Sequence, residues 1–251
     1  MTEAEWLGHE EPSRLLSSLF ARLRGDKPAA GDERFRRFAI ACCRRVAEVL
    51  EFGDTYALDC LEIYATSKLR DALLKARRFH RTPGNEASHA MTQAYNADAA
   101  TKLRVEARLL ATSAVWTCTK SRVTQAAMAY REAAVAMAHL NASREAKPNA
   151  RRNGGWLPPD RAELAVQAAF LRDIFGNPFR PPVAFAPEWR TDTAVSLAKQ
   201  MYESREFSAM PILADALQDA GCDNEDILDH CRQPGIHVRG CWVVDLVLGN
   251  V

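Results

Sequence analysis

Apolar residues recur at intervals of three and four along most of this chain, and no segment before residue 241 shows sustained apolar/polar alternation. The pattern is clearest over residues 35–50, where one stripe comprises Phe35, Phe38, Ala39, Cys42, Val46, Val49 and Leu50. Such spacing places apolar side chains on one face of a helix, whereas a half-buried strand requires alternation. The sequence therefore predicts an all-α protein: an irregular multi-helix array or bundle with a smaller helical C-terminal portion.

Capping residues predict where several of these helices begin and end. Thr2 and Glu5 have the spacing of a capping box, and Gly53 is placed to end the helix over residues 35–50. Thr191 and Ser208 are each expected to cap a helix in the C-terminal portion.

Composition changes along the chain predict three parts. Residues 85–140 are rich in Ala and nearly free of Gly and Pro, which favours long, closely packed helices. Residues 141–159 are dominated by Pro, Gly, Asn and like charges, which is typical of a loop or linker. We therefore expect a helical N-terminal portion over residues 1–140 and a helical C-terminal portion over residues 160–251. The segment 241–249 suits a strand or a helix, and we predict a helix.

The sequence predicts a cytoplasmic protein without a membrane span. Residues 1–30 contain no basic region followed by a continuous apolar stretch, which a secretory signal requires. The longest nearly uncharged apolar run, residues 241–247, is far shorter than the roughly 20 residues that cross a bilayer. Because the chain has seven cysteines, an odd number, we expect reduced and mostly buried thiols rather than a disulfide framework.

Several segments resemble an uncharacterised protein family that is abundant in planctomycete bacteria. The resemblance is carried by MTEAEWL and RFAIACCRR near the start, by DIFGNPFRPP in the middle, and most specifically by MPILADALQDAGCDNEDILDHCRQPGIHVRGCWVVDLVLG near the end. Residues 54–160 show no such motif. The resemblance implies a bacterial cytoplasmic setting and transfers no activity, ligand or site residue.

Five candidate metal ligands lie within twenty residues near the end of the sequence: Cys222, His230, Cys231, His237 and Cys241. Zn²⁺ prefers four such ligands in a tetrahedron. His237 and Cys241 are four residues apart, and only one of His230 and Cys231 is expected to join them, because adjacent helical side chains diverge. The cluster lacks the C-x-x-C spacing of common zinc motifs, so buried, apolar cysteines are the alternative interpretation.

The same residues suggest a Cys/His nucleophilic pair, which we consider less favourable. Cys231 or Cys241 would attack, with His237 as the base and Asp229 or Asp245 orienting it. This segment is the most acidic part of the chain, and negative surroundings raise a thiol pKa. The sequence also lacks H-E-x-x-H and the glycine-rich nucleotide motifs, so we expect a non-enzymatic protein.

The charge distribution offers a nucleic-acid hypothesis. The net charge is +1, but residues 201–251 hold only 3 of the 33 basic residues and 9 of the 32 acidic ones, so the preceding part is basic. Candidate phosphate-binding residues on one predicted helix are Arg70, Arg77, Arg78 and Arg81. Because no nucleic-acid motif accompanies them, we favour a solvated face or a dock for the acidic C-terminal portion.

The function that the sequence favours is a bacterial interaction or regulatory module with a protein partner. Helical arrays offer grooves to partner helices or peptides. Aromatic and arginine side chains in the two proline-rich segments are candidate contacts: Trp156, Phe179, Arg180 and Trp189. A zinc-binding C-terminal unit and a nucleic-acid-binding protein remain the two alternatives.

Overall fold

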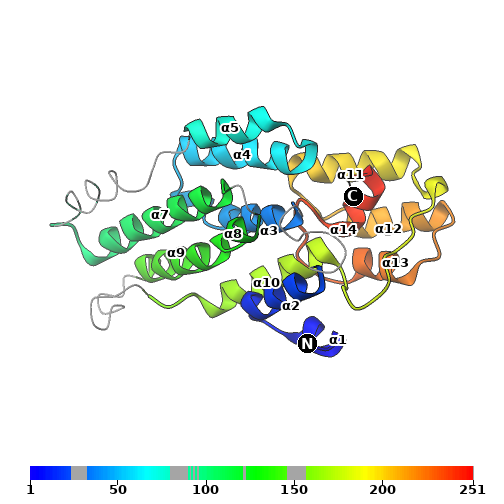
Figure 1. Ribbon diagram of the computed structural model, residues 1–251, viewed down its shortest axis with the longest axis horizontal. Coiled ribbons are helices and arrows are strands. Elements are labelled where there is room, and N and C mark those ends of the chain that lie inside the picture. The colour runs from blue at the N-terminus through cyan, green and yellow to red at the C-terminus, as the bar shows by residue number, and fades with distance from the viewer. Residues whose placement is uncertain are drawn as a thin grey trace. The chain divides into compact units, whose positions relative to one another are not determined.

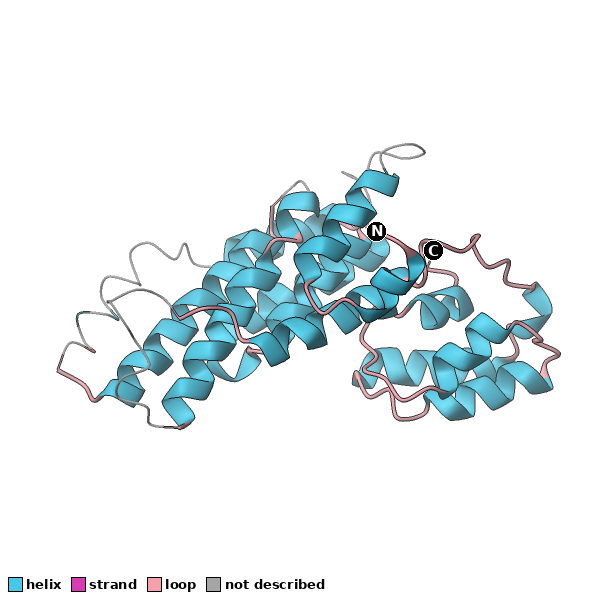
Figure 2. Ribbon diagram, turned by 90° about the horizontal axis from the view of Figure 1, so that it is seen from below, coloured by secondary structure: helices cyan, strands magenta, loops and turns pink. Residues whose placement is uncertain are grey.

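A computed structural model describes residues 1–23, 33–79, 90, 92, 94, 96–120, 123–145 and 157–250. Helices are the regular secondary structure of these residues, and no strand occurs among them (Figure 1, Figure 2). The predicted all-α class is confirmed. Within the same ranges, no helix combines the length and apolar character that crossing a bilayer requires.

The chain divides into two compact units. The larger unit comprises residues 9–168, and the smaller unit combines residues 1–8 with residues 169–251. This division differs from the predicted portions 1–140 and 160–251 in two ways. The first eight residues group with the C-terminal segment, and residues 160–168 group with the larger unit. The boundary at 168/169 falls within the helix α10 (Arg161–Phe175).

The larger unit is built around an Ala-rich helix pair. Its helices before α10 are α2 (Pro12–Leu23), α3 (Arg34–Arg44), the 3-10 helix η2 (Ala47–Val49), α4 (Phe52–Ser67), α5 (Arg70–Phe79), α7 (Ala99–Cys118), α8 (Val123–Ala126) and α9 (Ala129–Arg144). The helices α7 and α9 lie side by side (Figure 1). Small buried side chains such as Ala111 and Ala134, both 0% exposed, allow this close packing.

The predicted helix over residues 35–50 is wrong in its second half. The α3 helix ends at Arg44, and the chain continues through a turn into η2, where i→i+3 hydrogen bonds replace i→i+4 bonds. Val46 and Val49 stay buried because a three-residue spacing also fits a 3-10 turn. Gly53 does not end this helix and instead lies in the first turn of α4.

The predicted loop over residues 141–159 begins later than expected. The α9 helix continues to Arg144, so the first four residues of the predicted loop are helical. Residues 146–156 lie outside the described residues, and residues 157–159 have no regular secondary structure.

The smaller unit contains short helices around one apolar core. Its elements are α1 (Glu3–Gly8), the end of α10, the 3-10 helix η3 (Pro187–Trp189), α11 (Asp192–Ser204), α12 (Met210–Asp219), α13 (Glu225–Arg232) and α14 (Trp242–Leu248). Buried residues of α11 to α14, among them Met201, Leu213 and Val244, form the core. The helix predicted over residues 241–249 is confirmed as α14.

Two of the predicted caps in the smaller unit are confirmed, and one is wrong. Thr2 and Glu5 form the reciprocal capping box, with N–H to side-chain oxygen distances of 2.7 and 3.2 Å. The Thr191 hydroxyl accepts from the Ala194 N–H at 3.3 Å and caps α11. Ser208 does not cap α12, because it lies in a turn closed by the Met210 N–H bond to the Phe207 carbonyl, and the helix begins at Met210.

Candidate metal centre

The site begins with Asp173, a buried carboxylate in the last turn of α10. Its side chain is 3% exposed, on a helix whose apolar residues Phe170, Leu171 and Ile174 are buried. The Val238 N–H donates to Asp173 Oδ2 at 2.9 Å. This bond fixes the carboxylate and leaves Oδ1 directed at the other side chains of the site.

Two histidines approach this oxygen from different segments. His230, in the last turn of α13, places Nε2 3.1 Å from Asp173 Oδ1. His237, in the non-helical segment 233–241, places Nδ1 2.7 Å from the same oxygen. The two rings meet edge to face, with centroids 5.0 Å apart and an interplanar angle of 76°.

The fourth side chain is the Cys241 thiol, at the residue that precedes α14. Its Sγ lies 3.2 Å from His230 Nε2 and 3.9 Å from His237 Nδ1. Cys241 is fully buried, and the His230 side chain is the most exposed of the four at 19%. Thus one oxygen, two nitrogens and one sulfur converge, all within 4.8 Å of one another.

These separations fit the edges of a zinc tetrahedron. With Zn–ligand distances of about 2.0–2.3 Å, neighbouring ligand atoms in a tetrahedron lie about 3.3–3.8 Å apart. Four of the six pairs of ligand atoms are 2.7 to 3.9 Å apart, and all six pairs lie within 4.8 Å. Adjustments of a few tenths of an ångström to about one ångström would bring all four atoms to coordination distance.

The contacts do not have the order of a catalytic Cys-His-Asp relay. In a relay the thiol and the carboxylate contact different nitrogens of one imidazole. Here the single atom Nε2 of His230 faces both Asp173 and Cys241, and Nδ1 of His237 also faces both. Convergence of four ligand atoms on one point is the arrangement that a metal ion requires.

The surroundings of these groups set their protonation. Burial alone would raise the pKa of Asp173, but hydrogen bonds from His230 and His237 outweigh burial and lower this pKa. Burial raises the pKa of the Cys241 thiol well above its ordinary value, and the nearby Asp173 carboxylate raises it further. A thiol in such surroundings becomes a thiolate only with a compensating positive charge, which a metal ion supplies.

The structure separates the five predicted ligands into two groups. His230, His237 and Cys241 lie at the site, whereas Cys222 and Cys231 are 2% and 1% exposed within the apolar core and lie outside the converging group. Burial raises the pKa of Cys231 to about 12, which makes it a poor nucleophile. The Cys/His nucleophile hypothesis therefore finds no support in the geometry.

Asp173 is the residue that sequence reasoning missed. It precedes His230 by 57 residues and is one of many acidic residues on predicted helices. Its only signal in the sequence is its place between apolar residues that all face inward, which marks a buried and therefore paired carboxylate.

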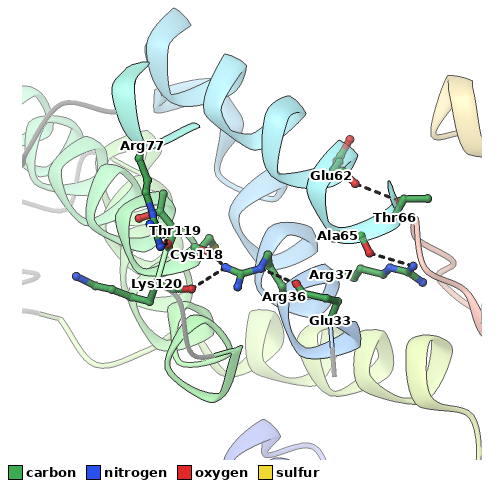
Figure 3. A network of polar contacts seen from close by, with 10 residues as sticks. All are labelled: Glu33, Arg36, Arg37, Glu62, Ala65, Thr66, Arg77, Cys118, Thr119 and Lys120. Atoms are coloured by element: carbon green, nitrogen blue, oxygen red, sulfur yellow. Dashed lines mark hydrogen bonds and ion pairs between the residues drawn. The ribbon is translucent and has the colours of Figure 1, made fainter. Parts of the chain in front are cut away.

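Of the four candidate phosphate-binding arginines, Figure 3 shows Arg77, together with Arg36 of α3, which binds carbonyls at the same helix end. Arg77 donates through Nε and Nη2 to the Thr119 carbonyl at 3.1 and 2.9 Å, at the end of α7. Fully buried Arg36 donates to the Cys118 carbonyl and, at 2.9 Å, to that of Lys120. Arg70 and Arg78 are exposed, and Arg81 lies outside the described residues.

The candidate partner-binding residues make contacts within the smaller unit. Arg180 pairs with Glu3 at 2.8 Å and with Asp226. Trp189 packs partly buried against the apolar core, and its ring meets that of Phe185 at 83°. The Phe179 N–H donates to the Asn177 side chain, and Trp156 lies outside the described residues.

No protein-family model matches this chain, and neither a curated protein nor a solved structure matches it.

Proposed function

We propose that the smaller unit binds one Zn²⁺ ion through Asp173, His230, His237 and Cys241. We further propose that this ion is a structural part of a non-enzymatic helical interaction or regulatory module. The observation that carries the proposal is the convergence of four ligand atoms within 4.8 Å of one another, drawn from α10, α13 and the segment before α14.

The chemistry of the four groups supports zinc. One thiolate, two imidazoles and one carboxylate form a set of mixed softness that suits Zn²⁺, whereas Mg²⁺ and Ca²⁺ prefer oxygen ligands. Four protein ligands complete a tetrahedron and leave no position for a water or substrate, which is typical of structural zinc sites. This supports a role in folding rather than in catalysis.

The position of the ligands supports a structural role as well. His237 and Cys241 belong to the segment 233–241, which has no helix of its own. A metal bound there would tie this segment to the ends of α10 and α13. Because such a site exists only in the folded chain, the binding free energy contributes to folding.

The resemblance to the planctomycete family remains part of the proposal. Three of its four segments, MTEAEWL, DIFGNPFRPP and the long final one, fall within the smaller unit, and together they contain all four proposed ligands. A bacterial cytoplasmic protein with a zinc-stabilised C-terminal unit is consistent with this placement.

The experiment that tests zinc binding compares two cysteine variants of the full chain. Purified protein is stripped with chelator, reloaded with Zn²⁺ or Co²⁺, and measured by native mass spectrometry and visible absorption. We expect one metal per chain, with the intense d–d bands of tetrahedral Co²⁺ and a thiolate-to-cobalt charge-transfer band. Cys241→Ala should abolish the charge-transfer band, whereas Cys231→Ala, equally buried, should retain both the band and the stoichiometry.

Two results would contradict the proposal. A chain that binds no metal after reloading would eliminate the site. A charge-transfer band that disappears in Cys231→Ala and persists in Cys241→Ala would move the thiolate ligand to Cys231.

A further inference from the structure

The N-terminal helix α1 is held by residues that adjoin Asp173. Trp6, which is fully buried, donates through Nε1 to the Gly176 carbonyl at 3.2 Å. Arg172, next to Asp173, donates through Nη1 to the Trp6 carbonyl at 3.0 Å. These two contacts of α1 lie one residue before Asp173 and three residues after it.

A second set of contacts joins α1 to α13, the helix that carries His230. Glu3 Oε1 accepts from Asn177 Nδ2 at 2.6 Å and from Arg180 Nε at 2.8 Å. Arg180 also pairs with Asp226. Asp226 and His230 are four residues apart on α13 and therefore lie on the same helix face. Arg180 thus bridges α1 to the helix that supplies one of the proposed ligands.

Close packing connects the same turn to the ring of His230. Gly176 has φ +64, and a Cβ there would lie 3.5 Å from the Trp242 indole. The Trp242 ring in turn lies 5.2 Å, centroid to centroid, from that of His230. The turn that binds Trp6 is therefore packed against Trp242, whose ring contacts that of His230.

From these contacts we infer that zinc binding regulates the docking of residues 1–8 on the C-terminal part of the smaller unit. This inference rests on the proposed function. A metal that holds Asp173 and His230 together fixes the relative positions of the end of α10 and of α13. Arg172 at the end of α10 and Gly176 just after it hold Trp6. Arg180, which binds Glu3, is itself paired with Asp226 of α13. Without the metal, the docked state of α1 is less populated.

The coupling has a reciprocal consequence. If zinc strengthens the docking of α1 by a given factor, the docking of α1 strengthens zinc binding by the same factor. A substitution in α1 that touches no ligand should therefore weaken zinc affinity. This effect distinguishes a coupled segment from one that is merely adjacent.

Hydrogen exchange on the full chain tests the coupling directly. We compare chelator-stripped protein with and without one equivalent of Zn²⁺ and follow by mass spectrometry the peptides that cover residues 3–8. Zinc should slow their exchange by at least about fivefold, the lower range of typical coupling. Peptides from α9 (Ala129–Arg144), in the larger unit, serve as the internal control and should not change.

A pair of glutamate variants tests the reciprocal effect. Glu3→Gln removes the charge that Arg180 binds, whereas Glu10→Gln makes the same change at an exposed residue of the larger unit. Zinc affinity, measured by competition with a chelating dye, should fall about fivefold or more in Glu3→Gln and remain unchanged in Glu10→Gln.

The outcomes separate the inference from the proposal on which it rests. One bound zinc with unchanged exchange in residues 3–8 would overturn the coupling and leave the metal site standing, as would equal zinc affinities of the two glutamate variants. Failure to bind zinc at all would overturn both.

Discussion

His139 is a fully buried histidine in α9 whose environment lowers its pKa. Its Nδ1 contacts the Val135 carbonyl at 2.9 Å, and its Nε2 lies 3.5 Å from the buried Glu106 carboxylate. Burial lowers the pKa of His139 below its ordinary value of 6.5, and the backbone contact opposes this only in part. The folded chain therefore keeps His139 neutral at pH values where the unfolded chain protonates it.

The sign of the effect follows from proton linkage. Below about pH 6.5 the unfolded state binds more protons at His139, so this residue reduces the free energy of unfolding as pH falls. We expect His139→Gln to lose this dependence, so that the stability difference between wild type and variant changes by on the order of 1 kcal/mol from pH 7.5 to pH 5. Urea unfolding at pH 7.5 and at pH 5 measures the stability difference between the wild type and His139→Gln. A difference that does not change with pH would show that His139 does not cause the pH dependence.

At the residue scale, the sequence predicted the local part of the proposed metal site. His230, His237 and Cys241 lie within twelve residues, and their residue types alone suggest metal binding. The choice between His230 and Cys231 depends on the face that α13 turns to the core. Asp173 depends on long-range folding, because nothing in its neighbours along the chain indicates a partner 57 residues later.

At the scale of single elements, arginine side chains repeatedly satisfy the carbonyls at helix ends. Besides Arg36 and Arg77 at the end of α7, Arg190 donates to the carbonyls of Leu246 and Val247 at the end of α14. Arg239 donates to the Tyr202 carbonyl near the end of α11. A guanidinium at these positions compensates both the unpaired carbonyls and the negative end of the helix dipole.

Arg77 and Arg78 form a matched pair that tests this role. Arg77→Ala should lower the free energy of unfolding by about 1–2 kcal/mol, because it removes a charged donor from the Thr119 carbonyl. Arg78→Ala, at the exposed neighbour, should change it by less than about 0.5 kcal/mol. Urea denaturation measures both, and equal effects would show that the carbonyl contact does not stabilise α7.

Apolar periodicity and caps predicted most elements, since both signals act within a few residues. The α3 helix shows where they fail: three-residue spacing of Val46 and Val49 fits an α-helix and a 3-10 turn alike. Ser208 shows a second limit, because a residue suited to capping can be used instead in a turn before the helix. The spacing of residues along the chain decides neither between an α-helix and a 3-10 turn at residues 46–49 nor between a cap and a turn at Ser208.

At the scale of the whole molecule, the proposed zinc ligands all belong to the smaller unit. Thermal unfolding of the full chain should therefore contain a zinc-dependent transition and a zinc-independent one. At a free zinc concentration 1,000 times Kd, the metal adds about 4 kcal/mol to the free energy of unfolding of the smaller unit. This is enough to raise the Tm of the zinc-dependent transition by more than about 10 °C.

Differential scanning calorimetry with chelator and with zinc measures the two transitions, and Cys241→Ala provides the control because it should abolish the shift. A single transition that moves as a whole, or equal shifts of both, would contradict the assignment of zinc to one unit.

The smaller unit is discontinuous in sequence, so its two parts are synthesised at different times. Trp6 is made early, but the Gly176 carbonyl that receives it follows 170 residues later. At about 5–20 residues per second, the ribosome needs roughly 10–30 s to make the intervening chain. During this interval all of residues 9–168 are synthesised, so the larger unit can fold before Arg172 and Gly176, which bind α1, have been made. The α1 helix is thus translated before residues 9–168 but can dock only after Gly176 has been made.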